Sequence, residues 1–438
     1  MLHGVLALGR AIQDSSLKKD GVRVIHMKIL HCLAQLPNRT GSGVYYKNLI
    51  REIKKQRGWE QAGLYALNGD NRRFDLDLGY IYPVRFESDE LPFPIAGMSD
   101  EMPYDSTAYS RMTPDMMEQW KKAFTSKLIE IKDEFNPDVI VCHHLWMLCA
   151  LVLSVFPDIP VVAISHGTDI RQARHNPILT EEHVGSLRNV RKVLALSGSD
   201  IESIHDLFDV SREQIVVTGG AYDPDVFYAY PGKNRGECVP GSPFRLLYAG
   251  KITDSKGVFE LVAAYRIVRQ THPDVTLDLV GREDQETLDR IKELSDDDPT
   301  IHLFDVESQA ILADHMRCCD LFVFPSYYEG MGLIAIEALA SGLHLVSNML
   351  PGLREQLGRE LVEDPVISWV ELPPLKNLDE IVDSARHEYI ESLAEAICFQ
   401  IERLKTEGGT GDFPFDKIAS CSWDCLVSEI INVIESVI

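Results

Sequence analysis

Two lysines and two glutamates carry the clearest chemistry in this sequence. Lys251 and Lys256 lie five residues apart just after a short apolar run, and Glu329 and Glu337 flank the start of a helix-like segment. Paired cations suit a diphosphate and paired carboxylates suit sugar hydroxyls, each through charge-assisted hydrogen bonds of about 1.5–3 kcal/mol. Each pair alone is explained equally well by solvated surface charge. The positions of the two pairs relative to each other therefore decide between surface charge and a binding site.

The residues between the two glutamates add backbone donors. Gly330-Met331-Gly332-Leu333 are expected to open a helix, whose free amide groups and positive dipole end suit an anion. Glycines there let a ligand approach the backbone closely. Because helical side chains lean toward the N-terminus of their helix, we expect Glu337 to point back at the same pocket as Glu329.

Alternating strands and helices are predicted to bring these residues together. In the second half of the chain, β-rich apolar runs predict strands at 245–250, 275–281, 301–306, 320–326 and 344–348, with helical patterns between them. In the common doubly wound order 3-2-1-4-5, the first and fourth of these strands are neighbours at the topological switch point, where ligands of such sheets bind. Gly250 and the lysines follow one of these strands, and Glu329 follows the other.

The first half repeats the same alternation. Strands are predicted at 28–34, 61–67, 138–142, 160–165, 192–197 and 214–218, and helices at 43–56, 114–135 and 199–207. Residues 231–243 contain three prolines and three glycines and are predicted to form a linker. The sequence therefore predicts an α/β protein with an extension at 1–26, doubly wound domains at 27–230 and 244–415, and a terminal segment at 416–438. The polar stretch 86–113 is either a loop over the cleft or a surface loop.

Composition narrows the function classes. The 438 residues carry a formal charge of −24, which argues against sequence-independent nucleic-acid binding. Nine scattered cysteines without a C-x-x-C pair favour a reducing cytoplasm over a disulfide framework or a structural zinc site. The helix at 43–56 is basic and reads either as a solvated face or as a contact for anionic lipid or a phosphorylated acceptor, at the inner face of a membrane in the lipid case.

The motif from Glu329 to Glu337 resembles the E-x7-E motif of retaining glycosyltransferases with the GT-B fold, most closely glycosyltransferase family 4. The flanking Phe324-Pro325-Ser326-Tyr327-Tyr328 and Ala338-Leu339-Ala340-Ser341-Gly342 match as well, and Lys251 and Lys256 stand where the family has Arg and Lys. The resemblance covers most of the chain from Met27 onward. It implies two Rossmann-like domains facing each other across a cleft, with a C-terminal helix that crosses back to the first domain.

The resemblance also implies roles for individual residues. Lys251 and Lys256 would hold the donor diphosphate, Glu337 the nucleotide ribose, and Glu329 the hydroxyls of the donor sugar. The amides of Gly330 to Leu333 would meet sugar and phosphate, and His166, which follows strand 160–165, would lie beside the donor sugar. The glycine-rich turn ending at Gly43 would face the donor phosphates and the acceptor, although a plain tight turn explains it equally well.

The sequence departs from the family pattern at His344 and at Asn348-Met349-Leu350-Pro351-Gly352, which replaces a common double glycine, and both changes are expected to reshape the second domain's pocket. The implied activity is metal-independent, retaining transfer of a sugar from a nucleotide diphosphate sugar to a small-molecule, glycan or lipid-linked acceptor, without a cofactor. Alternatives of the same fold are a nucleotide-sugar epimerase, a disaccharide phosphorylase or a non-catalytic nucleotide-sugar-binding protein.

Overall fold

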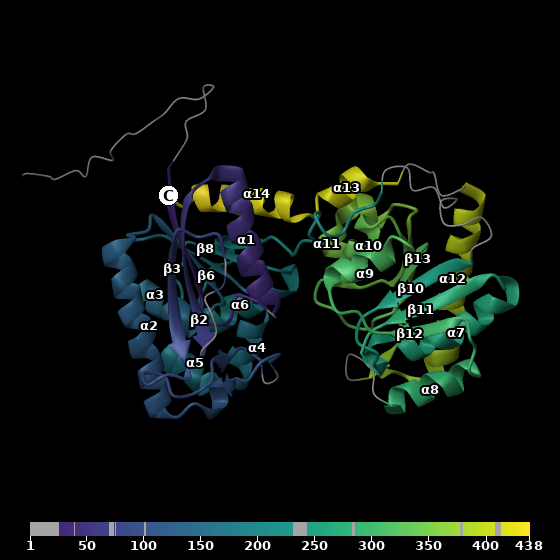
Figure 1. Ribbon diagram of the computed structural model, residues 1–438, viewed down its shortest axis with the longest axis horizontal. Helices are drawn as coiled ribbons and strands as arrows, with labels where there is room; N and C mark the ends of the chain where they lie inside the picture. Colours follow the sequence, from purple (N-terminus) through teal and green to yellow (C-terminus); the bar gives the residue numbers. More distant parts are fainter. Residues whose placement is uncertain are drawn as a thin grey trace, which may run out of the picture.

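Two parallel β-sheets organise the chain (Figure 1). The computed structural model describes residues 26–38, 40–69, 74, 76–99, 102–230, 243–282, 285–376, 380–407 and 413–438. The first sheet has the order β3-β2-β1-β6-β7-β8-β9. Its strands are β1 (Lys28–Leu33), β2 (Glu60–Asn68), β3 (Tyr80–Phe86), β6 (Val139–His143), β7 (Val161–Ile164), β8 (Lys192–Ala195) and β9 (Ile215–Val217).

The second sheet has the order β12-β11-β10-β13-β14-β15. Its strands are β10 (Phe244–Ala249), β11 (Val275–Val280), β12 (Ile301–Phe304), β13 (Leu321–Phe324), β14 (His344–Asn348) and β15 (Ile367–Val370). The predicted order of the first five strands is confirmed, because β10 pairs in parallel with both β11 and β13. The carboxyl ends that precede the lysines and Glu329 are therefore neighbours.

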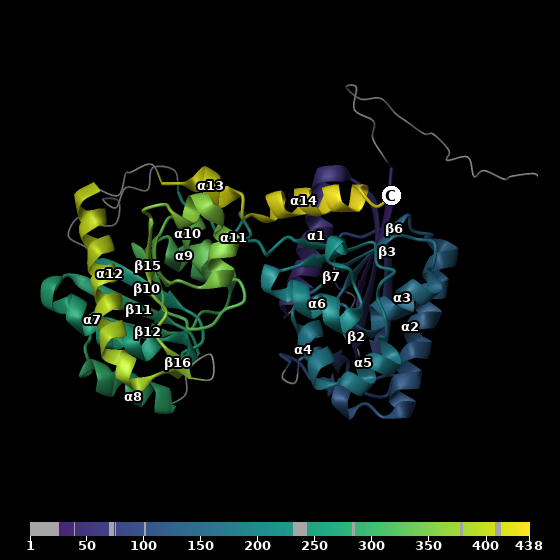
Figure 2. The same ribbon diagram turned by 180° about the vertical axis from the view of Figure 1, so that it is seen from behind.

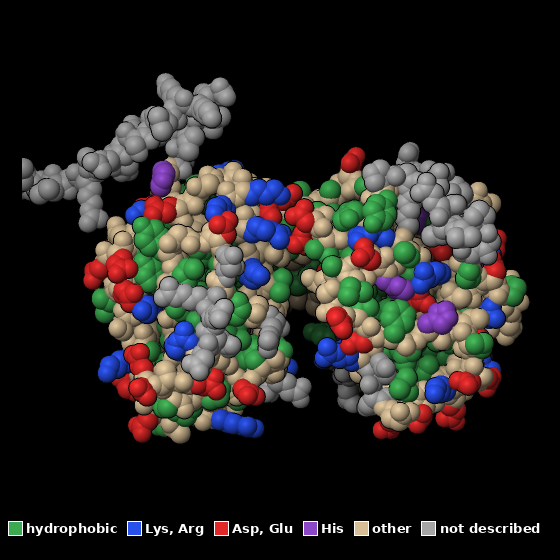
Figure 3. Space-filling model, viewed as in Figure 1, with side chains coloured by type: hydrophobic (Ala, Val, Ile, Leu, Met, Phe, Trp, Pro, Cys, Tyr) green, Lys and Arg blue, Asp and Glu red, His purple; other side chains and the backbone are tan. Residues whose placement is uncertain are grey.

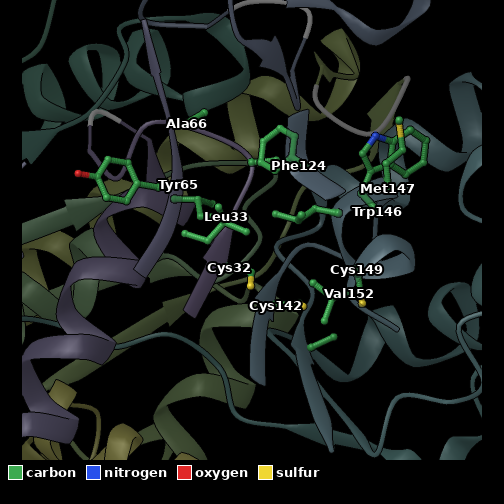
Figure 4. Packing of buried hydrophobic residues seen from close by; sticks show 14 of the residues in the cluster. Cys32, Leu33, Tyr65, Ala66, Phe124, Cys142, Trp146, Met147, Cys149 and Val152 are labelled. Atoms are coloured by element: carbon green, nitrogen blue, oxygen red, sulfur yellow. The ribbon is translucent and has the colours of Figure 1, made fainter. Parts of the chain in front are cut away.

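Helices cover both faces of the first sheet. One face packs against α2 (Pro114–Glu134), α3 (Met147–Val155), α4 (Thr168–His175) and α6 (Ile201–Phe208), with α5 (Pro177–His183) beyond them. Figure 4 shows this core from close by, with Cys32 and Cys142 from adjacent strands near Cys149 of α3. The opposite face packs against α1 (Gly41–Arg57) and α14 (Trp423–Glu435).

The second sheet is enclosed in the same way. One face packs against α7 (Val258–Thr271), α8 (Gln285–Ser295) and α12 (Arg386–Glu407). The other packs against α9 (Gln309–Met316), α10 (Leu333–Ala340), α11 (Pro351–Val362) and the short α13 (Phe415–Ala419). The apolar strands that read as continuous hydrophobic runs in the sequence are thus buried on both sides, as parallel sheets require.

Two segments that cross between the domains are bonded to each other. The amide of Tyr222 donates to the carbonyl of Cys421 at 3.1 Å, and the amide of Trp423 donates to the carbonyl of Tyr222 at 3.1 Å. Beyond this junction the chain enters α14, which lies along α1 of the first domain (Figure 2). The predicted return of a C-terminal helix to the first domain is confirmed.

Several elements differ from the prediction. The pattern missed β3, α3, α4, α5, β15 and α12, and the helix after Glu329 begins at Leu333 rather than at Gly330. The stretch 86–113 is not a plain surface loop, because its described residues include buried Leu91, Phe93, Ile95 and Met98 and the short strands β4 (Ala96–Gly97) and β5 (Thr107–Ala108). Nearly all of the predicted linker 231–243 and extension 1–26 lies outside the described residues.

Two further observations concern the whole described chain. The eight cysteines within the described ranges are free thiols. The sequence did not favour a disulfide framework. Among the same residues, every helix is too short or too polar to span a bilayer.

We expect Ile430→Ala to destabilise the first domain by about 2–5 kcal/mol, because the side chain is fully buried between α14 and the sheet and its removal leaves a cavity. The matched control is Ile438→Ala in the same terminal segment, where the side chain is 61% exposed and the cost should stay within about 0.5 kcal/mol. Urea denaturation measures both. Equal losses for the two variants would show that α14 does not complete the first core.

Candidate active site

A hollow of about 760 Å³ lies at the carboxyl ends of β10 and β13. Its lining includes Gly250, Lys251, Lys256 and Glu329, so four of the predicted site residues share one cavity. The opposite wall comes from the ends of β11 and β12, including Gly281 and Asp305. The site therefore sits at the topological switch point of the second sheet, where the strand order predicted it.

Lys256 and Glu329 are in direct contact. The Lys256 ammonium donates to the Glu329 carboxylate at 2.6 Å, and the Ser326 hydroxyl donates to the same oxygen at 3.2 Å. Both charged side chains are about a quarter exposed, so the pair lies at the cavity surface and is open to a ligand. An anion that binds Lys256 must compete with an internal carboxylate.

The loop that carries the lysines is held against the loop after β13. The amide of Tyr327 donates to the carbonyl of Ser255 at 3.1 Å. Gly257 adopts a left-handed conformation (φ 63°), and a β-carbon there would stand 2.3 Å from the carbonyl oxygen of Pro325. Only glycine fits this contact, which brings Lys256 to Glu329.

The segment 330–333 lies at the boundary between the domains. Gly332 caps α10 in a left-handed conformation (φ 66°) and is buried, whereas Gly330, Met331 and Leu333 line interdomain cavities. The start of α11 packs so closely here that a β-carbon on Gly352 would lie 2.0 Å from the carbonyl oxygen of Gly330. The backbone is thus fixed beside Glu329, with the first amides of α10 close by.

Glu337 does not share the hollow that holds the lysines. It lines a second cavity of about 700 Å³ between the domains, together with Asp223 and Lys47. Burial, reinforced by the nearby Asp223 carboxylate, raises the pKa of Glu337 to about 8. Asp223 is itself paired with Arg51 of α1 at 3.1 Å. The two glutamates of the motif therefore face neighbouring cavities, joined along the start of α10.

The first domain supplies the other wall of this cavity. Thr40 caps α1 by accepting from the amide of Gly43 at 3.0 Å, and Thr40, Gly41 and Ser42 line the cavity. Gly43 itself does not, because it packs beneath the preceding loop, where a β-carbon would stand 2.6 Å from the amide nitrogen of Asn38. The packing alone explains this glycine, and its predicted donor contact stays a prediction.

His166 faces the cleft between the two domains. It lines the 700 Å³ cavity and also a third one of about 1280 Å³, which reaches Glu329, Gly330 and Met331 of the second domain. Met98 and Met102, from the polar stretch after β3, also line the first of these cavities. Figure 3 shows the hollow between the two domains. His166 and residues 329–331 thus border one interdomain cavity, whereas Gly250, Lys251 and Lys256 line the hollow within the second domain.

Direct contacts close the cleft on one side. The Glu355 carboxylate of α11 accepts from the Ser197 hydroxyl at 2.8 Å and from the Gly198 amide at 3.0 Å. The Gln356 side chain donates to the carbonyl of Gly220 at 2.8 Å and accepts from its amide at 2.9 Å. Sequence reasoning missed these residues, since a single acid and amide in a polar helix carry no distinguishing pattern.

Of the two departures from the family pattern, His344 does not line the cleft cavities, whereas Leu350, Pro351 and Gly352 of the second line the cavity of about 1280 Å³. His344 lies at the amino end of β14, away from the cleft, and bonds Gln400 of α12 at 2.8 Å. Asn348 is buried and donates to the carbonyls of Pro325 at 2.8 Å and Ser326 at 3.0 Å. The expectation was wrong for His344, which joins a strand to a helix, whereas Asn348 supports the loop before Glu329 from behind.

The basic helix α1 is not an unopposed charged face. Four of its five basic side chains pair with acidic groups from other elements: Arg51 with Asp223, Lys54 with Asp77, Lys55 with Asp424, and Arg57 with Glu435. Lys47 faces the cleft instead. The observation favours a solvated, ion-paired face over a lipid contact, and the opposing charges were invisible in sequence because they come from distant segments.

Among the described residues, one group of side chains has the makeup of a metal site. Asp278, His315 and Cys319 bring ligand atoms within 4.8 Å of one another. Burial alone would raise the pKa of Asp278, but hydrogen bonds from His315, His302 and Arg245 outweigh it and hold the pKa well below its usual range. Arg245 thus satisfies this carboxylate as an ion pair, at 2.6 Å and outside the cleft.

Two Rossmann-like domains that face each other across a cleft of this kind define the GT-B class. The model of the family described as Glycosyltransferase Family 4 matches residues 40–226, and that described as Glycosyl transferases group 1 matches residues 235–362. In both domains the chain therefore resembles GT-B glycosyltransferases related to family 4.

Individual relatives agree with this placement. The glycogen synthase of Mycobacterium tuberculosis is 30% identical over 233 residues, 50% of this chain and 54% of the relative. The D-inositol 3-phosphate glycosyltransferase of an Arthrobacter species is 28% identical, over 49% of this chain and 55% of the relative. The chain thus matches about half the length of these curated relatives.

Solved structures share the fold over nearly the whole chain. A glycosyltransferase from Rickettsia africae superposes with a TM-score of 0.62 at 16% identity, covering 94% of this chain and 98% of that one. Anabaena HepE, solved in complex with UDP and glucose, superposes with a TM-score of 0.58 at 15% identity, covering 94% and 100%.

We expect Glu329→Gln to strengthen binding of a nucleoside diphosphate by about tenfold, since Lys256 would no longer be held by a carboxylate and the repulsion of the phosphates would fall (1.4 kcal/mol per factor of ten). Isothermal titration with UDP, GDP and ADP measures the change. The control is Glu371→Gln, which removes an exposed charge outside the cleft cavities. Weaker binding by the Glu329 variant would show that the ion pair supports the anion site instead of competing with it.

We expect stability to fall as pH rises from about 4.5 to 8, in part because of Glu337. Its pKa is about 8 in the folded protein against 4.5 when unperturbed, so the folded state binds more protons in this window and the unfolded state is favoured as they are lost. Glu337→Gln should therefore lose less stability than the wild type between pH 5 and pH 9 in urea denaturation. The Glu371→Gln control should keep the wild-type slope; an unchanged slope in the Glu337 variant would contradict the assignment.

Proposed function

We propose that this protein transfers a sugar from a nucleotide diphosphate sugar to an acceptor hydroxyl, with retention of configuration at the anomeric carbon. The observation that carries the proposal is the cavity in which Lys251, Lys256 and Glu329 meet at the ends of β10 and β13. Two cations suit the donor diphosphate there, and the carboxyl groups of Glu329 and, in the neighbouring cavity, of Glu337 suit the hydroxyls of the sugar and the ribose. HepE, which shares the fold, was solved with UDP and glucose.

The chemistry assigned to the chain is electrostatic. Negative charge develops on the leaving diphosphate, and fixed ammonium and amide donors around it provide the main stabilisation of the transition state. The leaving phosphate takes the proton of the acceptor hydroxyl on the same face of the sugar, so no protein base is needed and Glu329 acts by positioning. We propose that the lysines and amides make a metal ion unnecessary.

The acceptor belongs on the wall of the first domain, opposite the donor. Thr40 and Ser42 line this wall with side chains that carry hydroxyl groups, and Met98 and Met102 line it with apolar surface. Such a mixture suits a compound with both hydroxyl and carbon-rich faces. Closure of the two domains would exclude the water that otherwise hydrolyses the donor.

We expect Lys256→Ala to lower turnover by at least about 10²-fold, the usual cost of removing one donor from a site of developing negative charge. Thermal-shift screening of UDP-, GDP- and ADP-sugars identifies the donor, and acceptor-dependent release of the free nucleotide then measures turnover. Lys292→Ala, which removes an exposed lysine on α8 away from the cleft, is the control and should retain full activity. Chelation with EDTA should leave the wild-type rate unchanged.

Near-normal activity in the Lys256 variant would overturn the proposal. Turnover without any acceptor would indicate an epimerase or a hydrolase, and dependence on inorganic phosphate would indicate a phosphorylase. Binding of the nucleotide sugar without turnover of any kind would indicate a binding protein.

A further inference from the structure

Three histidines gather where β6 and β7 end. His143 is the last residue of β6, His144 follows it, and His166 lies two residues beyond β7. His143 and His144 are only 2% and 3% exposed, whereas His166 reaches the cavities. The Nδ1 atom of His143 lies 3.2 Å from the Nε2 atom of His166, which is a hydrogen bond. His166 thus meets the cleft with one of its two nitrogens already engaged.

Both rings are neutral near pH 7. Burial lowers the pKa of His143 well below its usual value, and the neighbouring His166, His31 and His144 lower it further. Burial and His144 do the same for the pKa of His166. Burial also lowers the pKa of His144, which takes no part in the hydrogen bond between His143 and His166. The Asp169 carboxylate of α4 opposes this by raising the pKa of His144. The hydrogen bond between the two rings therefore contains one proton, which either His143 or His166 supplies.

The surroundings of His143 favour one answer. If His166 donated, the proton of His143 would lie on its Nε2 atom, which is buried and has no partner among the described residues. Buried N–H groups without an acceptor are rarer in folded proteins than buried acceptors without a donor, and leaving one unpaired is unfavourable. If His143 donates from Nδ1, its Nε2 atom carries a lone pair instead. The proton of His166 then lies on its own Nδ1 atom.

Packing keeps the two rings in this relation. They are nearly parallel, at 11°, with their centroids 5.4 Å apart. Tyr45 of α1 meets both rings edge-on, at 5.3 Å from His166 and 6.1 Å from His143, and Trp423 of α14 meets Tyr45 at 4.8 Å. Within the described residues, the Nδ1 atom of His166 makes no hydrogen bond, and it is not among the enclosed polar atoms.

We propose that His143 is a positioning residue: by donating its Nδ1 proton to Nε2 of His166, it fixes the tautomer in which His166 offers a neutral N–H donor to a hydroxyl oxygen of the substrate. The inference rests on the proposed function, because a sugar in the cleft is what this donor would meet. The position of the proton on the His166 ring can be measured without any substrate.

Two amide variants separate position from mere polarity. His143→Asn places an amide N–H where Nδ1 of the imidazole lies, whereas His143→Gln places it where Nε2 lies. Both keep a polar, uncharged side chain of similar size at the same site. Thermal denaturation checks that both fold, and if one does not, the other still decides the outcome against the wild type.

The tautomer of His166 is read by ¹⁵N NMR on the full chain labelled at histidine, with the signal assigned by its loss in His166→Gln. We expect a protonated Nδ1 atom and an unprotonated Nε2 atom at pH 7.5 in the wild type and in His143→Asn. In His143→Gln we expect the Nε2-protonated form to appear. Protonated Nε2 in the wild type, or identical spectra in all three proteins, would overturn the inference.

Turnover supplies the second measurement. Loss of the partner that orients a metal-bound histidine costs about 10–100-fold. We expect kcat of His143→Gln to fall by a similar factor, with little change in KM for the donor. His143→Asn should stay within about threefold of the wild type, since the donor position is kept. If no nucleotide sugar is turned over by the wild type, the proposed function fails while the NMR result stands. Equal activity of both variants would show that His143 has no part in the reaction, and the NMR result on the tautomer would still stand.

Discussion

Parallel strands place all their carboxyl ends on one edge of a sheet, and this constraint determines where the protein has chemistry to offer. The loops after β10 and β13 are far apart in sequence, yet they bring Lys256 and Glu329 to 2.6 Å. In the first domain, the loops after β1 and β7 bring Thr40 and His166 to the wall of one cavity. Because the two sheets turn these edges toward each other, the polar loops of both domains line one space while their strands remain buried.

Internal ion pairs balance part of the charge in this space: Lys256 pairs with Glu329, and Arg51 pairs with Asp223. Burial, together with the Asp223 carboxylate, raises the pKa of Glu337. In a protein of net charge −24, an anion is attracted only by such a local arrangement. A phosphate group that binds Lys256 must therefore replace the ion pair with Glu329, which makes that part of the affinity a difference between two sets of contacts. Sugar hydroxyls, by contrast, meet carboxylates without any charge penalty.

The sequence was sufficient for the parts of this arrangement that depend on local pattern. The strand order of the second sheet, the meeting of Lys251 and Lys256 with Glu329, and the crossing helix followed from period, turn residues and the resemblance to a family. It was insufficient where partners come from distant segments. The ion pairs of α1, the separate cavity of Glu337 and the bond between His143 and His166 depend on tertiary geometry that no spacing encodes. Gly43 shows the converse, since a glycine that reads as a ligand contact is needed for packing.

The helix that crosses back has a consequence for biosynthesis. One face of the first sheet is covered by Leu426, Ile430 and Ile434 of α14, residues translated more than two hundred positions after the last strand of that sheet. Domains usually fold as they emerge from the ribosome, from the N-terminal side onward. The first domain therefore keeps this apolar face of its sheet exposed until α14 has been translated. A chaperone that shields that face during translation would protect the nascent chain through its most vulnerable interval.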